Sequence, residues 1–156
     1  MKRRLATGFS LIEILVVVAL GIVLTGIAIP MTSNAVKTMR LTAAVSTAAG
    51  TIQSTRYLAI MNAYPYQITF TPSTISYQIL SEVPPTATFS NVGTAVPLSG
   101  PGAVTISRTI TLQFYANGTV TEIPTTGNMT FSITNAIGGS NTLTVSSVGN
   151  VTVTSP

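Results

Sequence analysis

The sequence predicts an α+β protein in which one long, hydrophobic N-terminal α-helix packs on a C-terminal antiparallel β-domain. Residues 9–29 form an apolar run that is long enough for a membrane-length helix. Between residues 41 and 59, apolar side chains recur at spacings of four and three, which is typical of an amphipathic helix. From Tyr64 onward, apolar and polar residues alternate in short segments bounded by turn-forming residues, as in antiparallel strands.

These patterns divide the 156-residue chain into three parts. Residues 1–8 form a basic leader, residues 9–62 the N-terminal helix, and residues 63–156 a β-rich globular domain. Within the helix, we expect residues 9–29 to lie in a membrane or in the core of a filament. A chain of this length can build one compact domain beside such a segment, but not two sizeable cores.

Glu13 is the most informative residue of the apolar run. The other polar side chains of residues 9–29 are only Ser10 and Thr25. A carboxylate costs about 2.5–3.5 kcal/mol at the centre of a membrane helix and less near its end. An acidic residue in this place therefore predicts a function, and it needs a partner of opposite charge.

The second half of the predicted helix carries one apolar stripe that can face a folded domain. The stripe consists of Leu41, Val45, Ala48, Ile52 and Ala59. Pro30 separates this half from the apolar run and removes one backbone hydrogen bond. We therefore expect the helix to break at Pro30.

Strands are predicted wherever alternating residues lie between turn signals. They cover residues 66–70, 75–79, 109–114, 119–123, 129–133, 142–145 and 151–153. Thr71-Pro72-Ser73 predicts the turn of a first hairpin, and Asn117-Gly118 gives the strongest short hairpin signal in the chain. Residues 82–102 are rich in proline and glycine, so we expect mostly loop there.

Charge is scarce and unevenly placed. The formal net charge of +4 includes Lys2, Arg3 and Arg4, which belong to the leader. The rest of the chain has four basic side chains against three glutamates, a net charge of +1. Only 6% of all residues are charged, so polarity comes from Ser, Thr, Asn and Gln, which suits dense packing of subunits. The chain has no cysteine and hence no disulfide.

The composition argues against an enzyme and against a metal site or another cofactor. The chain has no histidine, cysteine or aspartate, so a Ser-His-acid or Cys-His arrangement and the usual zinc site cannot be built. Glu82 and Glu122 could act as a carboxylate pair only by converging from distant positions, and we expect both to be solvated. We therefore predict no catalytic residue, no metal site and no cofactor.

Residues 1–30 resemble the class III signal of type IV pilins and pseudopilins. A basic leader ends in Gly8, Phe9 opens the apolar run, Glu13 is the fifth residue of that run, and Pro30 falls where these helices usually break. The resemblance implies that a prepilin peptidase cuts after Gly8 and methylates the new N-terminus at Phe9. It also implies that Glu13 attracts the amine of a neighbouring subunit's first residue.

The β-rich part is similar to the C-terminal domain of minor pseudopilins of the GspH/FimT type. The similarity rests on Arg108 to Phe114 followed by Asn117-Gly118, and on Asn141 to Val145 ending near Gly149. It implies a structural minor pilin or pseudopilin subunit of a type II secretion pseudopilus.

Such a subunit crosses the bacterial inner membrane once, with its C-terminal domain in the periplasm or outside. The implied partners are the prepilin peptidase, other pilins or pseudopilins in a filament, and the inner-membrane assembly platform. The leader charges then lie on the side that the positive-inside rule favours.

Other functions stay open at this stage. A minor subunit of a type IV pilus, acting in assembly priming, adhesion or DNA uptake, shares the same motifs. A plain membrane anchor explains the length of the apolar run but not Glu13. An exported binding domain with an ordinary secretory signal would be cut near Gly26-Ile27-Ala28 and begin at Ile29, and this reading also leaves Glu13 unexplained.

The sequence argues against binding of nucleic acid. Some members of the resembled subgroup bind DNA through arginines that follow the C-terminal glycine. Gly149 is followed here by the neutral residues Asn150, Val151 and Thr152. Phosphate contacts supply most nonspecific affinity, and four scattered basic residues offer few of them.

Overall fold

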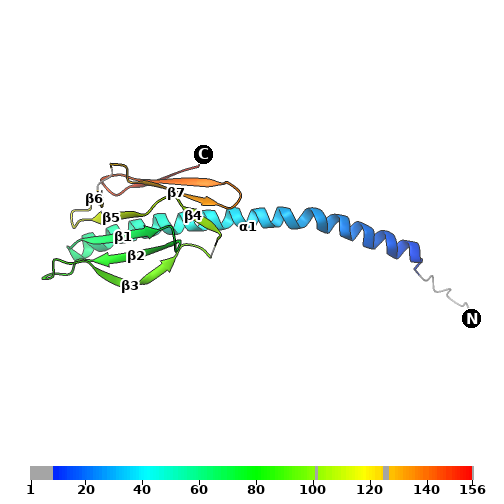
Figure 1. The fold of residues 1–156 in the computed structure, drawn as a ribbon, viewed down its shortest axis with the longest axis horizontal. Helices are drawn as coiled ribbons and strands as arrows, with labels where there is room; N and C mark the ends of the chain where they lie inside the picture. Colours follow the sequence, from blue (N-terminus) through cyan, green and yellow to red (C-terminus); the bar gives the residue numbers. More distant parts are fainter. Residues whose placement is uncertain (1–8, 101, 125–126, 156) are drawn as a thin grey trace, which may run out of the picture. The chain divides into compact units, whose positions relative to one another are not determined.

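The computed structural model describes residues 9–100, 102–124 and 127–155. In these residues one helix, α1 (Leu11–Asn62), is followed by nine strands. The strands are β1 (Tyr66–Thr71), β2 (Ser76–Ser81), β3 (Ser90–Pro97), β4 (Val104–Ile106), β5 (Ile110–Phe114), β6 (Val120–Glu122), β7 (Thr130–Asn135), β8 (Ser140–Val145) and β9 (Val151–Thr154). This element order confirms the predicted α+β class, with an apolar N-terminal helix and an antiparallel β-domain (Figure 1).

Helix α1 differs from the prediction at its start and at Pro30. It begins at Leu11 rather than at Phe9, and it is continuous through Pro30, so the expected break is absent. The break was expected because a proline removes one backbone hydrogen-bond donor from the helix. The residues on both sides keep their own backbone bonds, and the helix continues. Thr25 Oγ1 and Thr32 Oγ1 also donate to carbonyl groups one turn earlier, at 2.7 and 3.0 Å.

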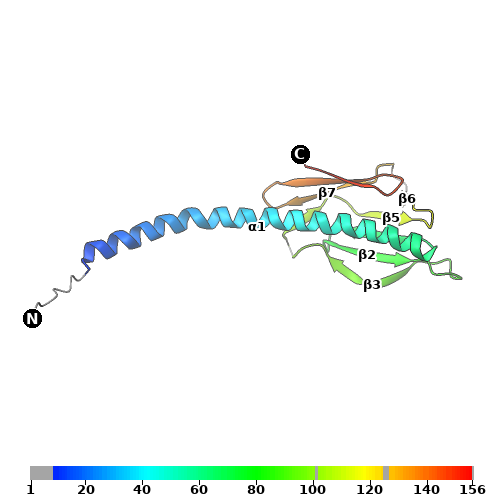
Figure 2. The ribbon, with the colours of Figure 1, turned by 180° about the vertical axis from the view of Figure 1, so that it is seen from behind.

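The chain forms two compact units, one up to Val36 and one from Lys37 onward. In the second unit, the predicted stripe of α1 is confirmed. Its five residues are buried, together with Ala44 and Thr55. The apolar ones belong to one core cluster with side chains from the inner faces of the two sheets. Figure 2 shows this half of α1 running beside the strands.

The two sheets hold the strands in the orders β3-β2-β1-β5-β6 and β4-β7-β8-β9. Inward-facing side chains alternate along the central strands, as in β1, where Tyr66, Ile68 and Phe70 are buried. Phe70 of the first sheet stacks on Phe131 of the second, with ring centroids 5.0 Å apart. This aromatic pair joins the two inner faces in the middle of the core.

Both predicted hairpins are confirmed. Strands β1 and β2 pair antiparallel from Tyr66–Ser81 to Thr71–Ser76. Strands β5 and β6 pair around Asn117-Gly118, where Gly118 has a φ of 80°. A positive φ at this turn is the conformation that favours glycine.

The expected loop at residues 82–102 contains strand β3, so that prediction was wrong in part. Strand β3 pairs with β2 at the edge of the first sheet, and all its side chains are exposed. Because neither face of β3 is buried, its sequence carries no apolar alternation. The pairing is irregular between Tyr77 and Ile79, where Gln78 donates to the Gly93 carbonyl at 3.3 Å.

A cluster of polar groups lies where α1 ends and β1 begins. Asn62 Nδ2 donates to the Tyr66 hydroxyl at 3.0 Å, and this hydroxyl donates to the Tyr64 hydroxyl at 3.2 Å. The two tyrosine rings stack with centroids 5.3 Å apart. Burial, assisted by the Tyr64 hydrogen bond, raises the pKa of Tyr66 from 10.0 to about 12.

We predict that the free energy of unfolding falls as pH rises from 10.0 to about 12. The folded pKa of Tyr66 lies above the unfolded one, so the stabilisation is fully present below pH 10.0 and is lost as pH rises through the folded pKa. Denaturant titrations of the full-length protein at several alkaline pH values measure this loss. Tyr66→Phe should flatten the pH dependence, whereas Tyr57→Phe, at an exposed position, should leave it unchanged. Equal slopes in the wild type and Tyr66→Phe would contradict the assignment.

Candidate functional site

The candidate site is the first turn of α1. The Ser10 carbonyl accepts hydrogen bonds from the backbone N–H groups of Glu13 and Ile14, at 3.1 and 3.3 Å. Ser10 therefore occupies the N-cap position, and Glu13 is the third residue of the helix. The pair Ser-x-x-Glu before an apolar run is the sequence signature of a capping box. Sequence reasoning missed this signal and with it the role of Ser10.

A carboxylate in this place has a local stabilising effect. The first turn of a helix carries a partial positive charge, so an acidic side chain there contributes about 0.3–1 kcal/mol at an exposed site. The cost of a carboxylate at the centre of a bilayer is larger, about 2.5–3.5 kcal/mol. The sequence Ser-x-x-Glu favours a helix start at this place, but the interaction of Glu13 with the helix dipole offsets only part of the cost that lipid burial of Glu13 would add.

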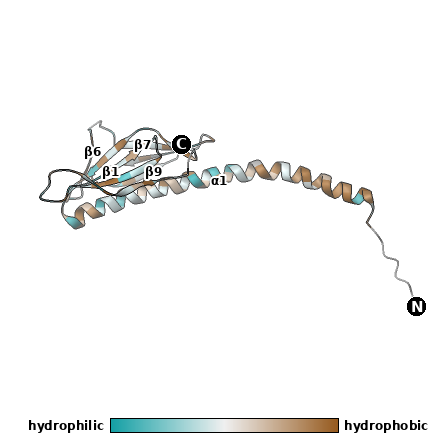
Figure 3. Cartoon of the chain, turned by 60° about the horizontal axis from the view of Figure 1, so that its bottom comes forward, coloured by the Kyte–Doolittle hydropathy of each residue, from teal (hydrophilic) through white to brown (hydrophobic). Residues whose placement is uncertain are grey.

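The residues around Glu13 are apolar and exposed. Glu13 itself is exposed, and Leu11 and Ile12 expose 81% and 62% of their surface. No ion pair joins Glu13 to another residue in the described part of the chain. Figure 3 shows that hydrophobic residues predominate in the N-terminal half of α1.

By length and apolar composition, α1 can cross a membrane once. None of its most apolar window is buried inside the described structure, unlike the core helix of a soluble protein. A secretory signal near an N-terminus also meets these criteria of length and apolar composition. Glu13 and its surroundings, rather than hydropathy, therefore distinguish the two readings.

The apolar segment has two different faces. Seven side chains line a shallow apolar hollow on one face: Phe9, Leu11, Ile14, Leu15, Val18, Ala19 and Ile22. At 3.6 residues per turn, Glu13 projects from the opposite face. A neighbouring helix can therefore contact the carboxylate from one side while a second neighbour packs into the hollow from the other.

The other residues of the predicted site are distributed as follows. Phe9 lies just before α1 and exposes 78% of its surface, and Pro30 lies inside the continuous helix. Gly8 and the rest of the leader lie outside the described residues.

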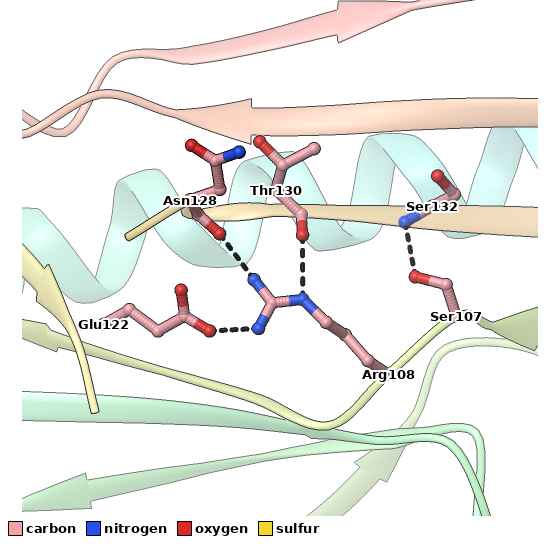
Figure 4. A network of polar contacts seen from close by, with 6 residues as sticks. All are labelled: Ser107, Arg108, Glu122, Asn128, Thr130 and Ser132. Atoms are coloured by element: carbon pink, nitrogen blue, oxygen red, sulfur yellow. Dashed lines mark hydrogen bonds and ion pairs between the residues drawn. The ribbon is translucent and has the colours of Figure 1, made fainter. Parts of the chain in front are cut away.

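Glu122 is buried, which corrects the expectation that it is solvated. Its side chain is only 5% exposed and forms an ion pair with Arg108 Nη1. Arg108 Nε and Nη2 donate to the carbonyl groups of Thr130 and Asn128, at 3.0 and 2.6 Å (Figure 4). The guanidinium thus links β6 of the first sheet to the start of β7 in the second. Alternation along β6 could have placed Glu122 inward, since it shares a face with buried Val120.

Arg56 links α1 to two turns of the β-domain. Its Nε donates to the Gly118 carbonyl at 3.1 Å, and Gln53 Nε2 donates to the Gly149 carbonyl at 3.3 Å. A Cβ atom at Gly149 would lie 2.5 Å from Arg56 Cδ. Gly149 therefore has a packing role under Arg56, and its φ of 78° also favours glycine.

Glu82 is half-buried just after β2. Glu122 pairs with the cationic side chain of Arg108, whereas the carboxylate pair considered from the sequence would have joined it to Glu82. In the described part of the chain, no group of three or more His, Cys, Asp or Glu side chains could hold a metal ion.

Comparisons with protein-family models, curated proteins and solved structures found no match.

We predict that Arg108→Ala lowers the free energy of unfolding by about 2–3 kcal/mol, because it leaves the buried carboxylate of Glu122 without its cation. The double variant Arg108→Met with Glu122→Leu should lose less than the single variants Arg108→Met and Glu122→Leu combined, since it removes both charges. Arg40→Ala, at an exposed position, should change stability by no more than about 0.5 kcal/mol. Denaturant unfolding of full-length protein gives all these values. Strictly additive losses would show that the pair has no energetic coupling.

Proposed function

We propose that this chain is a structural subunit of a pilin-type filament, anchored in the bacterial inner membrane and assembled in a type II secretion pseudopilus. The observation that carries the proposal is the exposed Glu13 carboxylate in the first turn of an exposed apolar helix. An anchor or a secretory signal requires the apolar residues but not the acid. A filament subunit uses both, because a neighbour can supply the missing positive charge.

The positive charge is the N-terminal amine produced by cleavage. In this proposal a prepilin peptidase cuts after Gly8, and Phe9 becomes the first residue. Phe9 lies two residues before the start of α1 and four residues before Glu13, so at most about 14 Å of chain separates the two residues. An axial shift of this order brings the amine of one subunit to the Glu13 carboxylate of its neighbour. In a low-dielectric filament core the two charges attract far more strongly than in water, so this pairing sets the axial register.

The β-domain has the surface expected of a packed subunit. Hydroxyl and amide side chains pair with one another across the outer faces of the sheets, for example Thr69 with Thr111 and Ser132 with Thr142, at 2.9 and 3.0 Å. A surface of neutral polar groups can approach another copy without strong repulsion between like charges. The domain then serves as a rigid body, while the apolar helix provides attraction between subunits.

The test of the proposal separates the charge of Glu13 from its capping role. Glutamine can occupy the last position of a capping box as glutamate does, but it carries no charge. We therefore predict that Glu13→Gln is processed normally yet reduces filament assembly by about tenfold or more, as Glu13→Ala does. The yield of sheared or crosslinked filament, relative to membrane-bound protein, measures assembly.

Two controls accompany this test. Ser10→Ala weakens the helix cap and leaves the charge, so it should retain most assembly. Gly8→Val should block cleavage and remain at the precursor mass. Wild-type assembly by Glu13→Gln would show that the carboxylate charge is dispensable and would overturn the pairing.

A further inference from the structure

The unit from Lys37 onward carries six charged side chains, and three of them are already engaged. Arg108 and Glu122 form the buried ion pair, and Arg56 donates to the Gly118 carbonyl. The other three are Lys37, Arg40 and Glu82. No ion pair joins any of these three to another residue in the described part of the chain.

Lys37 and Arg40 lie at one end of the domain. They are one helical turn apart at the start of the unit, before the buried stripe of α1 begins at Leu41. Arg40 is exposed and Lys37 is half-buried. The neighbouring Met39 exposes 70% of its surface. This end therefore combines two positive charges with an exposed apolar side chain.

Glu82 lies at the other end of the domain. Its backbone N–H donates to the Pro65 carbonyl at 3.0 Å, which places it beside the segment that follows the end of α1 at Asn62. Lys37 and Asn62 are separated by about 38 Å of helix at 1.5 Å per residue. Figure 1 shows β2, which precedes Glu82, running toward this end of α1. Val83 beside Glu82 is 45% exposed, so this end also combines charge with an apolar side chain.

We propose that copies of this chain stack head to tail, with Glu82 of one copy against Lys37 and Arg40 of the next. The inference rests on the proposed filament function and names the longitudinal neighbour as a second copy. The two ends are complementary in charge, whereas contact between two like ends brings equal charges together. A contact between different surfaces of the same chain does not close on itself, so it extends into a filament.

The energetics give this contact a defined role. Exposed ion pairs contribute little energy individually, so Glu82 and its partners select the orientation of stacked copies while the apolar helices supply most of the attraction. Residues 83–107 contain no charged side chain, so nothing in that long segment competes for the two cations. Phospholipid phosphates could also contact Lys37 and Arg40, but they would leave Glu82 without a role.

Engineered cysteines can test the contact, because the chain has none of its own. Full-length chains carrying Val83→Cys are co-expressed with differently tagged chains carrying Met39→Cys, and the membranes are oxidised; both positions are exposed neighbours of the charged residues, so the charges stay in place. The two positions are too far apart in one chain for a disulfide, which needs Cα atoms within about 7 Å. We expect a crosslinked dimer that contains both tags. Ser73→Cys replaces Val83→Cys in the matched control. Ser73 lies in the exposed β1–β2 turn, at the opposite end of the hairpin from Glu82, so this pair should not crosslink.

Chains carrying Ala19→Cys report helix contacts independently, since Ala19 lines the apolar hollow. Ala19 crosslinks without the crosslink between positions 83 and 39 would overturn head-to-tail stacking and leave the filament function intact. Absence of both would overturn both proposals.

Charge exchange provides a second readout. Glu82→Lys should reduce filament yield severalfold, and adding Lys37→Glu and Arg40→Glu should restore it. If Lys37→Gln with Arg40→Gln lowers the yield while Glu82→Lys has no effect, the cations contact lipid phosphate instead, and the proposal is wrong.

Discussion

The constraint on which this structure depends is the apolar surface of α1 before Val36. The large apolar side chains of this segment expose about half or more of their surface. Glu13, which carries a carboxylate, lies among them. Apolar area left in water costs about 25 cal/mol per Å², and a carboxylate in lipid lacks its hydration. Lipid can satisfy the first requirement but not the second. A membrane followed by a filament with a positive charge beside Glu13 satisfies both.

The β-domain contrasts with this segment, because its large apolar side chains are mostly covered by its own elements. The stripe of α1 and both sheets share one core, and the two engaged arginines connect elements within it: Arg108 joins the sheets, and Arg56 ties α1 to two glycine turns. The unit is thus a rigid body whose engaged charges serve its own fold. Its remaining charges lie at its two ends, so in the proposed filament recognition between copies would use those ends or the apolar helix.

Sequence patterns predicted most of the elements that have one buried face, but not the three-residue strand β4, whose Val104 and Ile106 are buried. The stripe from Leu41 to Ala59 and the hairpin at Asn117-Gly118 follow from periodicity and turn chemistry. Strand β3 escaped prediction because pairing with β2 at an edge leaves no buried face to pattern its sequence. The helix break predicted at Pro30 was wrong because only the hydrogen bond that proline removes was considered, and not the backbone hydrogen bonds of the residues on either side. Glu122 was predicted to be solvated because it is charged. The alternation along β6 places it on the same buried face as Val120.

The N-terminal mass of wild-type protein extracted from membranes tests the central claim most directly, because it shows whether the apolar segment stays in the mature chain. The account predicts a first residue of Phe9 carrying one methyl group, so that the amine and Glu13 belong to the same mature helix. A first residue of Ile29 would identify residues 9–29 as a removed secretory signal. That result would contradict the account, since neither Glu13 nor the apolar helix would be present to assemble a filament.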